Sequence, residues 1–151
     1  MDNLKLRIAD KDDIDVLVKA LVLSDIDEIE NIETSEIEEC KKRIFQEING
    51  DFLNSSTYII ELDLEKIGRL RLVETDNELF IAGIQILPNY RNLGLGTKVL
   101  NLLIKQALIT QKSLRLEVQK NNEKAKSLYK HLGFVVELEQ DDDYIMIKNT
   151  A

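Results

Sequence analysis

Apolar residues alternate with polar ones in some segments of this chain, and in others they recur every three or four residues. Alternation is typical of strands that bury one face, and the longer spacing is typical of amphipathic helices. The pattern therefore predicts a protein that contains both. The predicted strands are residues 4–8, 58–62, 67–73, 79–87, 114–118, 134–138 and 144–147, and the predicted helices include residues 14–21, 37–48, 99–107 and 125–132.

Residues that favour helix ends flank several of these segments. Asp10 is a predicted N-cap for the first helix, Thr34 or Ser35 for the second, and Asn122 for the last. The three consecutive strands before residue 88 are separated only by turn residues, which predicts an antiparallel meander. The order of elements, βααβββαβαββ, holds no repeat and no linker, so we predict a single α/β domain of mixed type over residues 1–151.

The composition narrows the chemistry that the chain can perform. Its 151 residues are 44% hydrophobic and 32% charged, as in a folded globular protein of one domain. A single cysteine, Cys40, and a single histidine, His131, exclude an internal disulfide and most zinc and triad chemistries, so no metal is expected. No apolar run is long enough to span a membrane and no signal-peptide pattern is visible, so we expect a cytoplasmic location.

The net charge of −8 argues against a nucleic-acid-binding surface, which would need clustered lysine and arginine. The acidic residues are concentrated in two segments that we interpret as solvated faces or as attractors of a cation. We expect a small or cationic partner. The acidic residues concerned are Asp25, Asp27, Glu28, Glu30 and Glu33 in one segment and Asp141, Asp142 and Asp143 in the other.

The turn between the strand that ends near residue 87 and the next helix is the most informative segment. The N–H groups of a first helical turn have no intrahelical partner and lie at the positive end of the helix dipole, so they bind anions. Two glycines keep the approach open, while an arginine and a threonine add polar groups. The segment therefore predicts a phosphate or pyrophosphate site. It reads Arg91, Asn92, Leu93, Gly94, Leu95, Gly96 and Thr97.

Two other phosphate-binding motifs compete with this interpretation. A P-loop requires Gly-x-x-x-x-Gly-Lys followed by Ser or Thr, and the chain contains no such run. A dinucleotide fingerprint requires a third glycine where Val99 stands, although Glu117 lies at about the spacing of its ribose-binding acid. The preceding meander also lacks the alternation of strand and helix that a nucleotide fold needs, so both motifs are disfavoured.

The sequence resembles the GNAT superfamily of acetyl-CoA-dependent N-acyltransferases in two motifs. Arg-x-x-Gly-x-Gly at residues 91–96 resembles the coenzyme A pyrophosphate signature of that family. Residues 116–118, the Asn-x-x-Ala-x-x-Leu-Tyr helix from Asn122 to Tyr129, and Leu-Gly-Phe at 132–134 resemble its downstream segment. The resemblance implies a central, mostly antiparallel, twisted sheet of the seven predicted strands, flanked by the four predicted helices.

The resemblance also implies roles for individual residues. The backbone of Ile84, Gln85 and Ile86 would pair with the pantetheine arm, residues 91–97 would bind the pyrophosphate, and Asn122 would reach the coenzyme arm. Tyr129 would be the general acid that protonates the departing thiolate, or else a core aromatic residue. The residue that takes the proton from the amine is left open between Glu78, Glu117 and water.

The activity implied by the resemblance is transfer of an acetyl group from acetyl-CoA to a primary amine by direct attack. No metal is implied, and a homodimer is possible. The acidic segments favour a cationic acceptor such as a polyamine, an amino sugar or a lysine-rich peptide. The alternative is a non-catalytic acyl-CoA-binding or regulatory module on the same fold.

Overall fold

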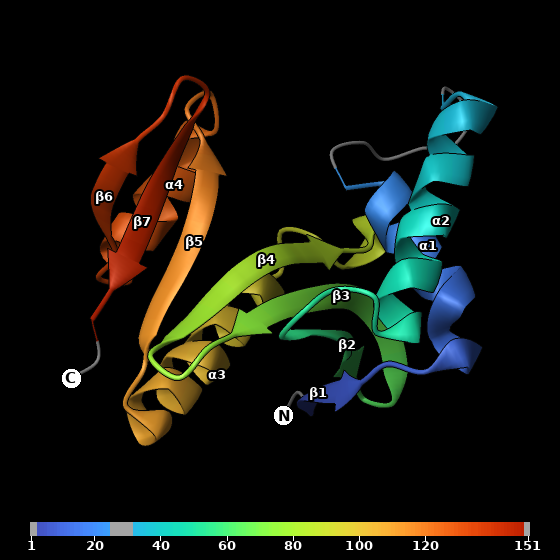
Figure 1. The fold of residues 1–151 in the computed structure, drawn as a ribbon, viewed down its shortest axis with the longest axis horizontal. Helices are drawn as coiled ribbons and strands as arrows, with labels where there is room; N and C mark the ends of the chain where they lie inside the picture. The colour runs from blue at the N-terminus through green and yellow to red at the C-terminus, as the bar shows by residue number, and fades with distance from the viewer. Residues whose placement is uncertain (1–2, 25–31, 150–151) are drawn as a thin grey trace.

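The computed structural model describes residues 3–24 and 32–149, which form a seven-stranded sheet with helices on both faces (Figure 1). The predicted mixed class and order of elements are confirmed. The strands are β1 Leu4–Ile8, β2 Ser55–Leu62, β3 Glu65–Glu74, β4 Glu78–Ile86, β5 Ser113–Gln119, β6 Val135–Glu139 and β7 Asp143–Lys148. The helices are α1 Ile14–Val22, α2 Thr34–Asn49, α3 Leu95–Thr110 and α4 Glu123–His131, with short 3-10 turns η1 Lys11–Asp13 and η3 Pro88–Tyr90.

Of the three predicted caps, Asn122 is the N-cap of its helix, whereas Asp10 caps the 3-10 turn η1 that leads into α1, and the N-cap of α1 is Asp13. The Asp10 side chain accepts a hydrogen bond from the Asp12 backbone at the start of η1, and the Asn122 side chain accepts one from Ala125 in α4. The predicted cap at Thr34 or Ser35 is wrong, because α2 begins at Thr34 and its N-cap is Glu33. The hydroxyl of Ser35 instead donates to the Glu33 carboxylate, 3.4 Å away.

The sheet changes character between β4 and β5. Strands β1 to β4 are antiparallel neighbours, as predicted for the meander, and β7 lies between β5 and β6 in the order β1-β2-β3-β4-β5-β7-β6. β4 and β5 run parallel but pair only through residues 78–81 of β4 and 113–116 of β5. Beyond these residues the two strands separate, as Figure 1 shows.

A register shift in the ladder between β3 and β4 lies at the point of separation. Arg71 is opposite Gly83 and Leu72 is opposite Ile81, so Ala82 has no partner residue in β3. Such a bulge bends a strand and changes which face its later side chains occupy. Leu79 and Ile81 before the bulge pack in the main core, and after it the residues that pack against that core are Ile84 and Ile86.

The two faces of the sheet are covered by different helices. The main core lies on the face covered by α3 and α4, and residues Val99 and Phe134 are fully buried in it. On the opposite face, Leu17 of α1 and Ile44 of α2 pack on Ile59 of β2. Fully burying a large aliphatic side chain stabilises the folded state by about 1.5–3 kcal/mol, because its apolar surface is removed from water. The sheet is therefore a partition between two separately packed layers.

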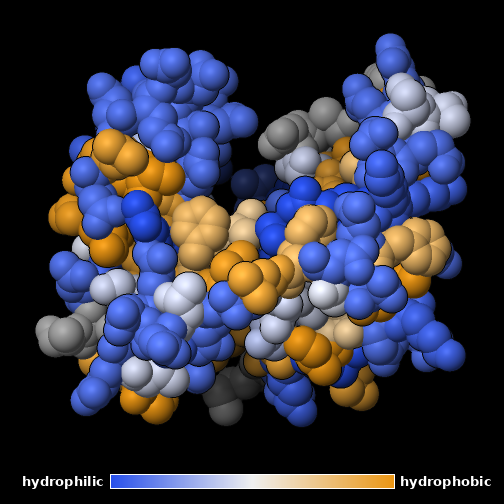
Figure 2. Space-filling view, viewed as in Figure 1, coloured by the Kyte–Doolittle hydropathy of each residue, from blue (hydrophilic) through white to orange (hydrophobic). Residues whose placement is uncertain are grey.

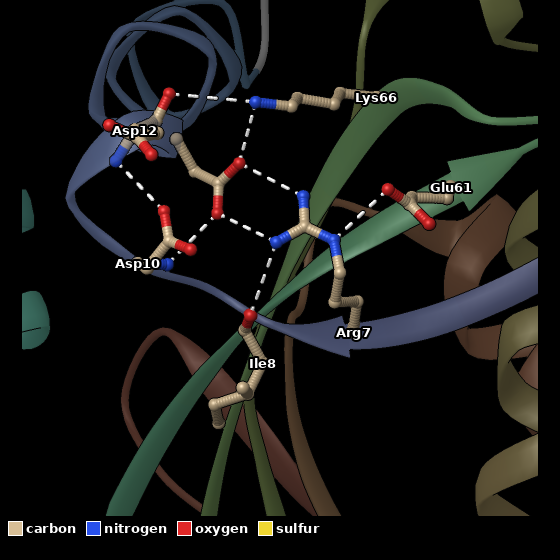
Figure 3. A network of polar contacts seen from close by, with 7 residues as sticks. Arg7, Ile8, Asp10, Asp12, Glu61 and Lys66 are labelled. Carbon is tan, nitrogen blue, oxygen red and sulfur yellow. Dashed lines mark hydrogen bonds and ion pairs between the residues drawn. The ribbon is translucent and has the colours of Figure 1, made fainter.

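A buried carboxylate joins the N-terminal elements (Figure 3). Asp13 of η1 is 1% exposed, and its two oxygens accept from the Arg7 guanidinium at 2.9 and 3.0 Å. Lys66 of β3 lies 2.7 Å from the same carboxylate, and Arg7 also bonds Glu61 of β2. Bidentate pairing with Arg7 holds the pKa of Asp13 well below its ordinary value. The network thus ties η1 to β1, β2 and β3.

No helix within residues 3–24 and 32–149 is both long and apolar enough to cross a membrane.

Candidate active site

A cavity of about 320 Å³ opens where β4 and β5 separate. In the space-filling view the molecule is hollowed between the side that carries β5 to β7 and the side that carries α1 and α2 (Figure 2). The cavity therefore lies in a gap of the sheet itself and is lined from both of its edges. Its lining consists of Phe80, Ile81, Ala82, Gly83, Ile84, Gln85, Leu116, Glu117, Val118, Gln119, Asn122 and Tyr129.

The β4 side of the cavity offers main-chain groups. From Ala82 onward this edge of β4 has no strand partner among the described residues, because the pairing with β5 ends at Ile81. An unpaired strand edge presents its N–H and C=O groups to whatever extended molecule lies beside it. Of the residues expected from the sequence to contact a ligand through the backbone, Ile84 and Gln85 line the cavity, while Ile86 lies just beyond it.

The turn that follows β4 also leaves its backbone donors open. Asn92 and the N-cap Gly94 have positive φ of 62° and 74°, and the helical hydrogen bonds begin at Lys98. Within the described chain, no N–H group of residues 92–97 has a hydrogen-bond partner. A Cβ built on Gly96 would meet no atom within 4 Å. The fold itself therefore does not require glycine at 96, and the space beside it can admit an anion.

Arg91 braces this turn. Its Nε donates to the Ile86 carbonyl at 2.8 Å, and its Nη2 donates to the Leu23 carbonyl just after α1. The guanidinium thus links the end of β4, the turn and the end of α1, and it brings a positive charge to the anion-receptive segment.

Tyr129 reaches the cavity from α4. Its ring packs edge-on against Phe134 with centroids 5.9 Å apart, and burial raises the pKa of its phenol. The hydroxyl has no hydrogen-bond partner within the described residues. A phenol with a raised pKa keeps its proton at neutral pH, so it is available as a hydrogen-bond and proton donor in the cavity. Asn122, the N-cap of α4, lines the cavity beside it.

The two carboxylates considered for proton removal lie in different surroundings. Glu117 lines the cavity, and the pKa of its carboxyl is raised by a side-chain hydrogen bond shared with Asp143 of β7 and by desolvation. Glu78 lies outside the lining, where β4 and β5 are still paired, and its Oε1 is 3.3 Å from Nη1 of Arg115. The arrangement favours Glu117 as the group that can exchange a proton inside the cavity.

Sequence reasoning missed a buried polar network behind the cavity wall. Glu47 of α2 and Arg69 of β3 are 8% and 3% exposed and form an ion pair at 2.5 Å, and Arg69 also donates to Gln85 at 2.6 Å. The sequence did hold a signal for this network, because Glu47 stands beside the apolar stripe of a predicted helix and Arg69 stands within an apolar predicted strand. Buried charges need partners, so each predicts the other.

The acidic segments are only partly placed. Asp25, Asp27, Glu28 and Glu30 lie outside the described residues. Glu33 is exposed at the start of α2, and Asp141 and Asp142 are exposed between β6 and β7.

The pKa of the half-buried Cys40 is raised by burial, so its thiol stays protonated at neutral pH.

The described residues thus form a mixed sheet that opens at a parallel pair of strands, with a glycine-containing turn directly after β4. Residues 24–134 match the family model described as Acetyltransferase (GNAT) family, and the chain belongs to this family. The family resemblance drawn from the two sequence motifs is confirmed.

The relatives differ in how much of the chain they match. A spermidine N(1)-acetyltransferase of Escherichia coli strain K12 is 37% identical over 84 residues, which is 53% of this chain and 45% of that protein. The match therefore spans less than half the length of this curated relative.

Solved structures match nearly the whole chain. The Campylobacter jejuni N-acetyltransferase PseH in complex with acetyl coenzyme A has a TM-score of 0.72 at 21% identity, over 99% of this chain and 100% of that one. The spermidine/spermine N-acetyltransferase SpeG of Vibrio cholerae has a TM-score of 0.72 at 19% identity, over 97% and 94%. At these identities the similarity establishes the fold.

Proposed function

We propose that the protein transfers the acetyl group of acetyl-CoA to a primary amine. The observation that carries this proposal is the set of unpaired N–H groups at residues 92–97, placed directly after a strand whose open edge lines the cavity. A diphosphate bound at the turn and an extended arm along the β4 edge would bring the thioester to the cavity. Family membership and a PseH structure holding acetyl coenzyme A support it.

In this proposal each predicted site residue has one task. The backbone of Ile84, Gln85 and Ile86 pairs with the pantetheine arm, and Asn122 contacts the arm from the other wall. The turn from residue 91 to residue 97 binds the diphosphate through backbone N–H groups, with the charge of Arg91 and the Thr97 hydroxyl nearby.

The acid and the base approach the cavity from opposite faces of the sheet. Tyr129 packs against the main core, whereas Glu117 alternates with the buried Leu116 and Val118 and so points to the other face. Glu117 takes a proton from the amine, whose nitrogen then attacks the thioester carbon. As the C–N bond forms and the C–S bond breaks, Tyr129 protonates the departing thiolate, and the proton released by the acylated nitrogen restores the phenol. The reaction needs no covalent enzyme intermediate and no metal.

We propose a small, cationic acceptor. Glu117 in the cavity lining, its hydrogen-bond partner Asp143, and Asp141 and Asp142 nearby in sequence would attract an ammonium group. A relative named as a spermidine acetyltransferase supports a cationic amine. We also propose that the protein is located in the cytoplasm and that it forms a homodimer.

Wild-type protein should release coenzyme A thiol when acetyl-CoA and a cationic amine are both present, and Tyr129→Phe tests the catalytic step. The variant should lower kcat about 100-fold at unchanged affinity for acetyl-CoA, since general acids typically contribute at least that much. Thiol release and a thermal shift with acetyl-CoA measure the two quantities.

Tyr58→Phe is the matched control, because Tyr58 is a half-buried tyrosine of β2 outside the cavity lining. Its kcat should equal that of wild type. A protein that binds acetyl-CoA but releases no thiol with any amine would instead be the non-catalytic acyl-CoA-binding module.

Glu117→Gln should lower kcat/KM about 100-fold at pH 7, because the variant can no longer take the proton of the ammonium group. The deficit should shrink as the pH approaches about 10, where free amine is abundant without an enzymatic base. A pH profile of acetylation measures it. Glu78→Gln should keep the wild-type profile, and equal rates for Glu117→Gln and wild type at pH 7 would contradict the assignment.

A further inference from the structure

Gln85 is held by a buried relay of polar and charged groups from three other elements. Its Oε1 accepts from Nη1 of Arg69 at 2.6 Å, and Arg69 also donates from Nε to Glu47 at 3.2 Å. The Glu47 side chain is fully buried and also accepts from the Thr57 hydroxyl at 2.7 Å. Residues of α2, β2 and β3 therefore fix the amide of a residue on β4.

The relay also fixes the orientation of the amide. A guanidinium can only donate, so the oxygen of Gln85 must face Arg69 and the NH2 group must face away from it. Gln85 lines the cavity, and its Nε2 has no hydrogen-bond partner within the described residues. A Cβ at Gly83 would lie 2.9 Å from Arg69 Nη1 and 3.2 Å from Gln85 Nε2, so this glycine leaves the room that the arrangement needs.

The amide lies on the same face of the sheet as Glu117. Beyond the bulge at Ala82, Ile84 and Ile86 pack toward the main core, so Gln85 faces the layer of α1 and α2, where Arg69 and Glu47 bond it. Glu117 occupies that face on the opposite wall of the cavity. The cavity thus presents a carboxylate on one wall and a double N–H donor on the other.

We propose that Gln85 determines acceptor specificity by donating a hydrogen bond to an oxygen of the acceptor. The acceptor would then be a primary amine that carries a hydroxyl or carbonyl oxygen near its amino group. This inference rests on the proposed function and narrows it. A pair of N–H donors repels an ammonium group but binds oxygen, so the amine goes to Glu117 and the oxygen to Gln85.

The buried relay is what makes such a contact selective. A glutamine side chain that rotates freely loses conformational entropy when it binds a substrate. The amide of Gln85 is already held by Arg69 in the folded protein, so binding costs it less entropy. A site built to donate to a substrate oxygen disfavours an analogue that lacks it, because the donor is then left without its partner.

Two pairs of amines that differ in one oxygen-bearing group test the inference. They are 1,3-diamino-2-propanol with 1,3-diaminopropane, and glycinamide with ethylamine. For each pair we measure the ratio of kcat/KM for the oxygenated amine to that for its partner, in wild type and in Gln85→Met. The wild-type ratio should exceed the variant's about 10-fold, the upper end for one neutral hydrogen bond. The oxygen also changes amine basicity, but this effect is the same for both enzymes.

Two further variants complete the experiment. Gln85→Glu keeps an oxygen for Arg69 and loses the NH2 group, so its ratio should fall as in Gln85→Met. Gln106→Met removes an exposed glutamine of α3 and should keep the wild-type ratio. A melting temperature with acetyl-CoA checks that each variant is folded.

The outcomes separate this inference from the function on which it rests. If wild type acetylates amines with the same ratio as Gln85→Met, the inference is overturned and the proposed function stands. If wild type acetylates no amine at all, both are overturned.

Discussion

Replacing Gly96 with aspartate is expected to abolish the stabilisation of the protein by acetyl-CoA while leaving the fold intact. A side chain at this position meets no protein atom within 4 Å, and Gly96 lies in the first turn of α3, where an acidic residue suits the helix dipole. The new carboxylate would occupy the space proposed for the diphosphate. Two unit charges 4 Å apart near a protein surface repel by about 4 kcal/mol. We therefore expect acetyl-CoA to bind at least about 100-fold more weakly.

The melting temperature with and without acetyl-CoA measures this effect. A ligand at a hundredfold its dissociation constant stabilises the native state by about 2.7 kcal/mol, so wild type should show a clear shift and Gly96→Asp none. Asn101→Asp adds the same charge at an exposed position of α3 and should keep the shift. An undiminished shift in Gly96→Asp would show that the diphosphate binds elsewhere.

Asp13→Asn is expected to destabilise the protein by about 3 kcal/mol. The variant removes a carboxylate that is 1% exposed and leaves Arg7 and Lys66 without their shared anion. Breaking a buried ion pair costs about 3–5 kcal/mol, and the lower end applies because both cations are about one third exposed and regain water. The melting temperature should fall by roughly 6–12 °C for a chain of this size.

The same carboxylate predicts how stability depends on pH. The pKa of Asp13 is lowered in the folded state, so its contribution is complete above the unfolded pKa of about 3.9 and is lost as the pH falls below it. Urea unfolding from pH 7 to pH 3 should show that the difference in free energy of unfolding between wild type and Asp13→Asn narrows below about pH 4. Asp12→Asn, at the exposed neighbouring position, should stay within about 0.5 kcal/mol of wild type. A wild-type stability unchanged at pH 3 would contradict this account.

The fold could be predicted from sequence because most of its helices and strands are marked by short local sequence patterns. The alternation of Leu4, Leu6 and Ile8 and the caps Asp10 and Asn122 each depend on a few neighbouring residues. The second helix shows the limit, since Thr34 is compatible with both the cap and the first helical position. The exact first residue of such a helix depends on how the helix packs, and its own sequence does not determine this.

The candidate site was predictable where it is a continuous segment and unpredictable where it joins distant strands. The glycine turn and Tyr129 belong to local motifs, and the structure brings Tyr129 and Asn122 to one cavity. The contact between Glu117 and Asp143 exists because β7 inserts beside β5, and the hold on Gln85 depends on a bulge in β4. Strand order and register arise from the whole sheet, so no short pattern reveals them.

The short pairing between β4 and β5 has a consequence for the cohesion of the molecule. Among the described residues, only 78–81 and 113–116 pair along this line between the two halves of the sheet, so the rest of β4 and β5 makes no backbone hydrogen bonds across it. A pantetheine chain lying in the gap would supply hydrogen bonds that a strand otherwise provides. On the proposed function, the acyl carrier acts as the missing strand of a sheet that the polypeptide leaves unfinished.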